Sequence, residues 1–194
     1  ERERRQTAVH EAGHALLTRL LEPDSRLRRL SILPTGGGLN AAGYSMSVPR
    51  ERTLYTRREL NNRLSIMLAG RAAEQLVFGE QEVSSGAAND IARATELAAQ
   101  MELELGMRDC PVSLRALGAN DESAIKELLS SRYEAALELL QLNLPRLARL
   151  AEALMREEAL DEQQLAKLLD NDTCCETPSD MKAACLCEAD SVAS

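Results

Sequence analysis

The sequence predicts a mostly helical fold with a short β element of two strands and a bundle of helices towards its C-terminal end. The 194 residues are 44% apolar but only 2% aromatic, so the core must consist of aliphatic side chains, mostly leucine and alanine, which favour helices. Six prolines and ten glycines are too few for the many turns of a β sandwich or barrel. Apolar residues also recur at the spacing of amphipathic helices over several long stretches.

Two strands are predicted to follow the first helix. Residues 1–21 should form that helix, because apolar side chains recur there at helical spacing and Pro23 follows. The strands are expected at 27–33 and 43–48, each closed by a proline. The glycine triplet at 36–38 between them is interpreted as a loop, since no lysine or helix start follows it as in a phosphate-binding loop.

Capping residues mark the next two helices. The pattern Thr-Arg-Arg-Glu at 56–59 is a capping box, so a helix is predicted from there to about Val77, where Gly79 ends it. Ser84–Gly86 offers capping side chains for a further helix at 87–105.

Three more helices are predicted in the last part of the chain. Beyond a loop at 111–120, long amphipathic helices are expected at 121–142 and 145–158. Asp161–Gln164 should cap a short last helix that ends near Leu169.

We expect one domain over residues 1–169, with a catalytic part at 1–110 and a helical part at 121–169. Residues 170–194 lose the periodicity and are expected to form a disordered tail. Four of the five cysteines lie in this tail: Cys174, Cys175, Cys185 and Cys187. An odd count gathered in a polar tail does not indicate a disulfide scaffold, so unpaired thiols in a reducing compartment are expected.

Charge and hydropathy exclude several classes of function. The net charge of −8 and the few aromatic residues disfavour nucleic-acid binding. No apolar run approaches the roughly 18 residues that a membrane-spanning helix needs. The chain begins with Glu1 instead of Met, so we expect a piece of a longer protein, in which a membrane anchor could lie upstream.

The two histidines of the chain, His10 and His14, lie four residues apart, and Glu11 directly follows the first. Four residues turn a helix by about 400°, so both imidazoles leave the same face one turn apart. They can occupy two corners of a zinc tetrahedron, with the glutamate beside them as general base, as in the H-E-x-x-H pattern of zinc peptidases. The alternative is a solvent-facing helix, but the apolar stripe through Val9 and Leu16 buries an adjoining face.

A catalytic zinc also needs a third protein ligand and one open position. No third histidine exists, so the donor must be an aspartate, glutamate or cysteine. Glu74, in the second long helix, and Asp90, in the first turn of the third, are the two candidates. Each also has a purely structural explanation, as an exposed helical carboxylate or as a carboxylate that complements a helix dipole. Spacing alone leaves the choice open.

Three segments resemble, in order and spacing, the motifs of the peptidase domain of the FtsH family, the membrane-bound ATP-dependent zinc metalloproteases. Thr7–Ala15 matches T-A-x-H-E-A-G-H-A. Leu68–Gly79 is close to L-G-G-R-x-A-E-E-x-x-F-G, and Ser84–Thr95 is close to S-T-G-A-x-N-D-x-x-x-A-T. A later segment, Leu150–Leu160, is similar to L-A-x-x-L-x-x-x-x-x-L, so the resemblance spans about residues 1–169.

The chain departs from this pattern at several positions. Ala69, Gln75 and Ser85 replace the family's usual residues. Pro34–Tyr44 is longer and richer in glycine than the family's P-R-G-x-A-x-G-Y turn, and the tail after Asn171 matches none of its motifs. The chain contains no G-x-x-x-x-G-K-[ST] motif, so ATP could act only through an upstream module.

The resemblance implies a ligand set for one Zn²⁺ per chain. Asp90 would be the third ligand beside His10 and His14, and no other cofactor is expected. Glu74 and Asn89 would lie around the ligands without binding the metal.

The implied activity is that of a zinc endopeptidase domain in an ATP-dependent protease that degrades unfolded or membrane proteins. Zinc would activate the attacking water, and Glu11 would be the catalytic general base. The strand at 43–48 is expected to be an edge strand that binds extended substrate through main-chain hydrogen bonds. Its contact residues would be Gly43, Tyr44, Ser45 and Met46.

The resemblance further implies a homohexamer in the full-length protein. It places the domain, as a soluble unit, on the cytoplasmic face of a bacterial inner membrane or on the equivalent side of an organellar membrane. Contact with the membrane would occur only through an anchor outside this chain. The alternatives are a catalytically silent domain that acts as an assembly scaffold and a free-standing peptidase.

Overall fold

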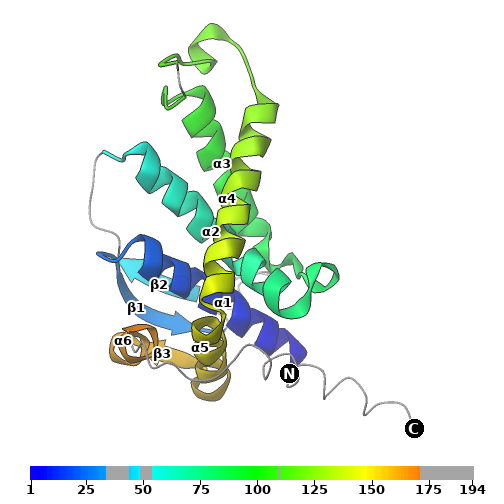
Figure 1. The fold of residues 1–194 in the computed structure, drawn as a ribbon, viewed down its shortest axis with the longest axis vertical. Helices are drawn as coiled ribbons and strands as arrows, with labels where there is room; N and C mark the ends of the chain where they lie inside the picture. Colours follow the sequence, from blue (N-terminus) through cyan, green and yellow to red (C-terminus); the bar gives the residue numbers. More distant parts are fainter. Residues whose placement is uncertain (34–43, 49–53, 109, 171–194) are drawn as a thin grey trace.

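The computed structural model describes residues 1–33, 44–48, 54–108 and 110–170. Most of these residues are helical, and the strands form one small antiparallel sheet, so the predicted mostly helical fold is confirmed (Figure 1). Within the described ranges, no helix is long and apolar enough to cross a membrane. The predicted glycine loop lies outside the described residues, as does the predicted tail from residue 171 onwards.

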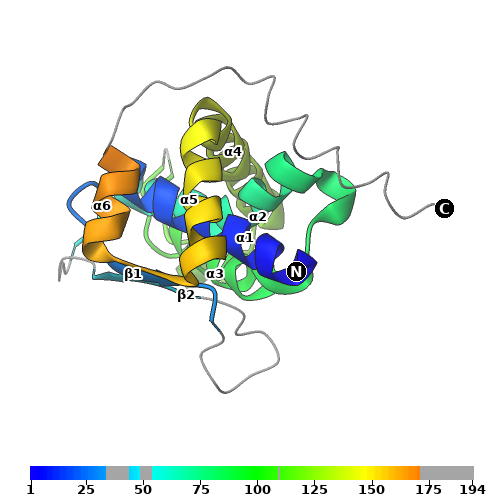
Figure 2. The ribbon, with the colours of Figure 1, turned by 90° about the horizontal axis from the view of Figure 1, so that it is seen from below.

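Helix α1 (Arg2–Leu21) is the element around which the others are arranged (Figure 2). It packs most extensively against α2 (Arg57–Phe78), which was predicted from its capping box, and against α5 (Leu144–Glu157). Its middle turns are buried continuously from Ala8 to Gly13, including both polar residues His10 and Glu11. A helix buried in this way can hold its polar side chains in a fixed geometry.

The sheet has three strands in the order β2-β1-β3, all paired antiparallel. The central strand is β1 (Arg26–Ser31), with β2 (Tyr44–Val48) and β3 (Ala159–Asp161) as the edges. The first two strands are those expected from the sequence, whereas the third was not expected. Three residues between two helices are too few to show alternation, so only pairing with Arg29–Ser31 reveals β3.

The start of α3 (Ala88–Leu103) differs from the prediction. The Ser84 hydroxyl accepts a hydrogen bond from the Gly86 N–H at 3.2 Å and caps a short 3₁₀ helix, Ser85–Ala87. α3 then begins without a side-chain cap of its own, because the 3₁₀ turn leads directly into it. The predicted loop at 111–120 likewise contains a 3₁₀ turn, Arg115–Leu117.

The C-terminal helices are α4 (Glu122–Leu142), α5 and α6 (Glu162–Asp170), as predicted within a few residues. They pack less against one another than against the earlier elements, α4 on α2 and α5 on α1. The main hydrophobic core accordingly combines side chains from Ala8 to Leu169. A smaller cluster lies between α2, α3 and α4. The division into a catalytic and a helical part stays a prediction.

Close contact between α1 and α2 depends on small residues. A Cβ atom at Gly13 would lie 2.7 Å from both the Ala69 carbonyl oxygen and the Ala73 Cβ. Real Cβ atoms do not approach other atoms so closely, so α2 can occupy this position only beside a glycine. The two helices are therefore held close together at the turn of α1 that carries the histidines.

Candidate metal centre

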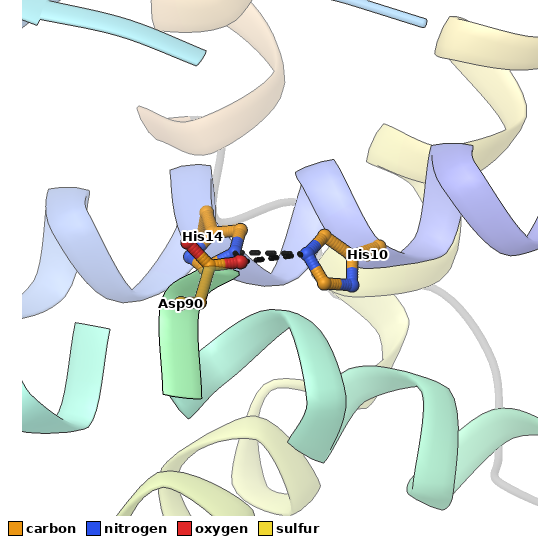
Figure 3. A group of neighbouring side chains, drawn as sticks. All are labelled: His10, His14 and Asp90. Atoms are coloured by element: carbon orange, nitrogen blue, oxygen red, sulfur yellow. Dashed lines mark hydrogen bonds and ion pairs between the residues drawn. The ribbon is translucent and has the colours of Figure 1, made fainter. Parts of the chain in front are cut away.

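Two helices bring three potential metal ligands together (Figure 3). His10 and His14 project from successive turns of α1, and their Nε2 atoms lie 3.1 Å apart. Asp90, in the first turn of α3, places its Oδ2 3.2 Å from His10 Nε2 and 3.3 Å from His14 Nε2. One donor atom from each residue lies within 4.8 Å of the other two.

The hydrogen bonds of the two Nδ1 atoms determine which nitrogen of each imidazole ring carries the proton. His10 Nδ1 lies 2.7 Å from Glu74 Oε1, and His14 Nδ1 lies 2.8 Å from the Ile66 carbonyl oxygen. A carbonyl oxygen and an ionised carboxylate only accept hydrogen bonds, so both Nδ1 atoms carry the proton. In the neutral rings, the lone pairs of both Nε2 atoms therefore face the Asp90 carboxylate. Three acceptors converge on one point, which is the arrangement that a cation requires.

Glu74 is buried on the far side of His10, with 1% of its surface exposed. Its Oε1 accepts from His10, and its Oε2 accepts the backbone N–H of Ser84 at 2.7 Å. Burial alone would raise the pKa of Glu74, but these hydrogen bonds outweigh it and lower the pKa. Both oxygens of this ionised carboxylate are therefore engaged away from the point where the three acceptors meet. A carboxylate so placed orients the imidazole and makes it a stronger ligand.

The protonation equilibria reflect this crowding of acidic groups. Burial alone would lower the pKa of His10, but hydrogen bonds to Asp90 and Glu74 and the nearby carboxylate charges raise it to about 9. Burial alone would raise the pKa of Asp90, but its contacts with both histidines hold the pKa far below its usual value. Without a metal, a proton on His10 can thus take the place of the cation between the ring and Asp90.

Glu11 lies between the two histidines on α1 and is only 8% exposed. Burial raises the pKa of its carboxyl group, and the neighbouring charges of His14 and His10 oppose this rise without cancelling it. A carboxyl group with a raised pKa holds a proton more readily than an exposed one, which suits a group that must accept a proton and release it again.

Gly70 is a site residue that the sequence analysis missed. A Cβ atom at this position would lie 2.4 Å from Cε1 and Nε2 of His10 and 2.6 Å from Nε2 of His14. The two rings therefore lie directly against the backbone of α2. A glycine inside a helix costs roughly 1 kcal/mol relative to alanine, and this cost was the signal in the sequence for a close approach.

Asn89 and the residues of the expected substrate strand are the remaining site residues predicted from the sequence. Asn89 is exposed, and no hydrogen bond of its side chain is found among the described residues. The strand predicted to bind substrate is present as β2 from Tyr44 to Val48, at the edge of the sheet and in contact with α1. Gly43 lies outside the described residues.

The sequence model of peptidase family M41 matches residues 1–123. The chain belongs to this family. Its sequence is 42% identical over 193 residues to the ATP-dependent zinc metalloprotease FtsH of Methylibium petroleiphilum, covering 87% of this chain and 31% of that relative. Similarity extends to FtsH 3 of Synechocystis, with 34% identity over 194 residues, 87% of this chain and 32% of the relative.

A eukaryotic relative shows the same likeness to this M41 chain. The ATP-dependent zinc metalloprotease YME1 homolog of Schizosaccharomyces pombe is 37% identical over 177 residues, 86% of this chain and 24% of the relative. The M41 chain thus spans about a third or less of the curated relatives that it matches. The resemblance to the FtsH family is confirmed, and family membership makes zinc the metal to test at the three acceptors.

Proposed function

We propose that this chain is the zinc endopeptidase part of a longer ATP-dependent protease. The observation that carries the proposal is the convergence of His10, His14 and Asp90, with each outer imidazole nitrogen already bound to an acceptor. Two nitrogen donors and one carboxylate form the kind of three-residue set that leaves a zinc coordination position open for catalysis. The names of the M41 relatives supply the choice of zinc and of proteolysis.

His10 and His14 would bind the metal through Nε2, and Asp90 would bind it through a carboxylate oxygen. Zinc held there would lower the pKa of a water molecule and polarise the carbonyl of the bond to be cleaved. Glu11 would accept the proton from the attacking water and pass it to the nitrogen of the leaving amine. Glu74 would keep the His10 ring in the orientation that directs Nε2 towards the metal.

Substrate would bind as an extended chain along β2. This strand pairs with β1 on one side, and the described part of the chain places no strand on its other side. Its second row of backbone N–H and C=O groups can therefore pair with an added strand. Main-chain pairing accepts many sequences, which suits degradation of unfolded or membrane proteins.

In the full-length protein we propose a homohexamer in which an upstream ATPase module supplies unfolded substrate. The domain would lie on the cytoplasmic face of a bacterial inner membrane or on the equivalent side of an organellar membrane, anchored by a segment outside this chain. These proposals rest on the M41 relatives, of which this chain covers only a part.

Metal content and cleavage of an unfolded protein such as casein test the proposal. We expect one zinc per chain and metal-dependent cleavage. The variant Glu11→Gln should keep its zinc and lose nearly all cleavage, because it retains the helix but lacks the proton acceptor. Zinc binding without any cleavage by the wild type would favour the catalytically silent scaffold. If Glu11→Gln cleaved casein as fast as the wild type does, another group would have to activate the water.

A further inference from the structure

A hollow of about 410 Å³ lies beside the C-terminal end of α1. One wall is formed by Leu21 and Glu22 and by the turn that follows, as far as Ser25. The opposite wall is formed by Tyr55 and by the first turns of α2, including Asn62 and Arg63. The hollow is thus separate from the three acceptors, but the same helix, α1, contributes to both.

The substrate strand β2 ends beside this hollow. Val48, the last residue of β2, pairs with Arg26, which directly follows the turn in the wall. The C-terminal end of α1, the arrowhead of β2 and the start of α2 all lie on the left in Figure 1. A polypeptide paired with β2 and continuing past Val48 would therefore reach the hollow.

Helix geometry gives the separation, along α1, between the wall of the hollow and the metal ligands. Leu21 lies seven residues beyond His14 on α1, which corresponds to about 10 Å along the helix axis. An extended chain rises about 3.3 Å per residue, so about three substrate residues span this distance. The hollow would therefore accept the part of the substrate about three residues from the cleaved bond.

The walls of the hollow are held by specific contacts. The Arg63 guanidinium lies 4.1 Å from the centre of the Tyr55 ring and donates a hydrogen bond to its hydroxyl at 3.2 Å. Arg63 Nε lies 3.5 Å from Glu22 Oε1, and Asn62 Nδ2 donates to the Leu21 carbonyl oxygen at 3.2 Å. These contacts join the end of α1 to the start of α2, so the lining is formed before substrate arrives.

The chemistry of the lining favours a main chain over other ligands. Carboxylate, amide, hydroxyl and guanidinium groups all line the hollow, so it contains both donors and acceptors. A single anion or cation would meet a like charge on one wall, and a large apolar side chain would displace water from these polar groups without offering hydrogen bonds in return. The peptide groups of an extended polypeptide offer donors and acceptors in equal number and suit both walls.

We propose that this hollow is a distal subsite that binds the main chain of the substrate about three residues from the cleaved bond. The proposal rests on the proposed endopeptidase function. Such a subsite would make cleavage depend on the length of the substrate on one side of the bond. The side chain of the substrate residue in the hollow would matter little.

The test compares two peptides around one cleavable bond, one with five residues on each side and one with two. Ser25 lies half-buried in the wall, with its hydroxyl 3.2 Å from Glu22 Oε2, so Ser25→Trp places an indole in or across the hollow. The matched control is Ser123→Trp, which makes the same change at an exposed position near the start of α4 that does not line the hollow. Anisotropy of the labelled long peptide on metal-free protein measures binding without cleavage.

We expect the wild type to prefer the long peptide, and Ser25→Trp to reduce the ratio of long-peptide to short-peptide kcat/KM about tenfold, the value of one or two hydrogen bonds. Binding of the long peptide should weaken to the same extent, and Ser123→Trp should match the wild type in both measurements. An equal loss for both peptides, or no loss, would overturn the subsite. Binding that Ser25→Trp weakens, without cleavage by the wild type, would retain the subsite and refute the endopeptidase function.

Discussion

Replacing Gly70 by alanine tests whether the backbone of α2 sets the position of both imidazoles. The new Cβ would lie 2.4 Å from His10 Nε2 and 2.6 Å from His14 Nε2. Non-bonded atoms of this kind need about 3.5 Å, so each ring must move by about 1 Å. The Nδ1 atoms are held by Glu74 and by the Ile66 carbonyl group, so this movement stretches those bonds or turns Nε2 away from Asp90. We expect Gly70→Ala to weaken zinc binding by about 10- to 100-fold.

Stability of the metal-free fold should change much less. Forcing an extra methyl group into a packed site costs about 1–3 kcal/mol. Replacing a glycine inside a helix by alanine recovers about 1 kcal/mol of this cost. Zinc affinity is measured by competition with a chromophoric chelator, and the free energy of unfolding is measured in urea with EDTA. If Gly70→Ala bound zinc as tightly as the wild type, the backbone of α2 would not set the position of the imidazoles. A large loss of stability would instead attribute weaker zinc binding to impaired folding.

Three further predictions concern the same site. Asp90→Ala should lose zinc on dialysis, whereas Glu74→Ala should retain it with about 10- to 100-fold lower affinity. The reverse result would make Glu74 the metal ligand and Asp90 the supporting residue. Ser84→Pro fits the local backbone, with φ −83°, but removes the N–H bonded to Glu74. It should cost about 1–3 kcal/mol in urea unfolding, more than the control Ser84→Ala, which removes the hydroxyl but keeps the N–H. For His10, burial lowers the pKa and carboxylate contacts raise it, to about 9 from 6.5. The proton on His10 therefore stabilises the metal-free fold fully below pH 6.5, and this stability is lost as the pH rises to 9. The free energy of unfolding in EDTA should show this decrease in the wild type and not in His10→Gln.

Helices were predicted well because their signals are local. The capping box at Thr56 and Glu59 forms as expected, and the periodic apolar residues of α1 are buried. β3 and the contact of Ser84 with Glu74 were not predicted, because each depends on residues that meet only after the chain folds. Ser84 carries the typical side chain of a helix cap, yet its backbone N–H makes the contact nearest to the site.

The sequence by itself determined the chemistry of the His10-Glu11-x-x-His14 turn, because helical spacing places both imidazoles on one face whatever surrounds them. Spacing in the sequence left both Glu74, within α2, and Asp90, in the first turn of α3, as candidates for the third ligand, because the packing of these helices is not encoded locally. The family resemblance implied that Asp90 is the ligand, and the tertiary structure shows on which side of His10 each carboxylate lies. Close packing of α2 on α1 directs Glu74 to the Nδ1 side of His10, and the start of α3 directs Asp90 to the Nε2 side. Which helix faces Nδ1 and which faces Nε2 is decided by packing between elements that are distant in the sequence.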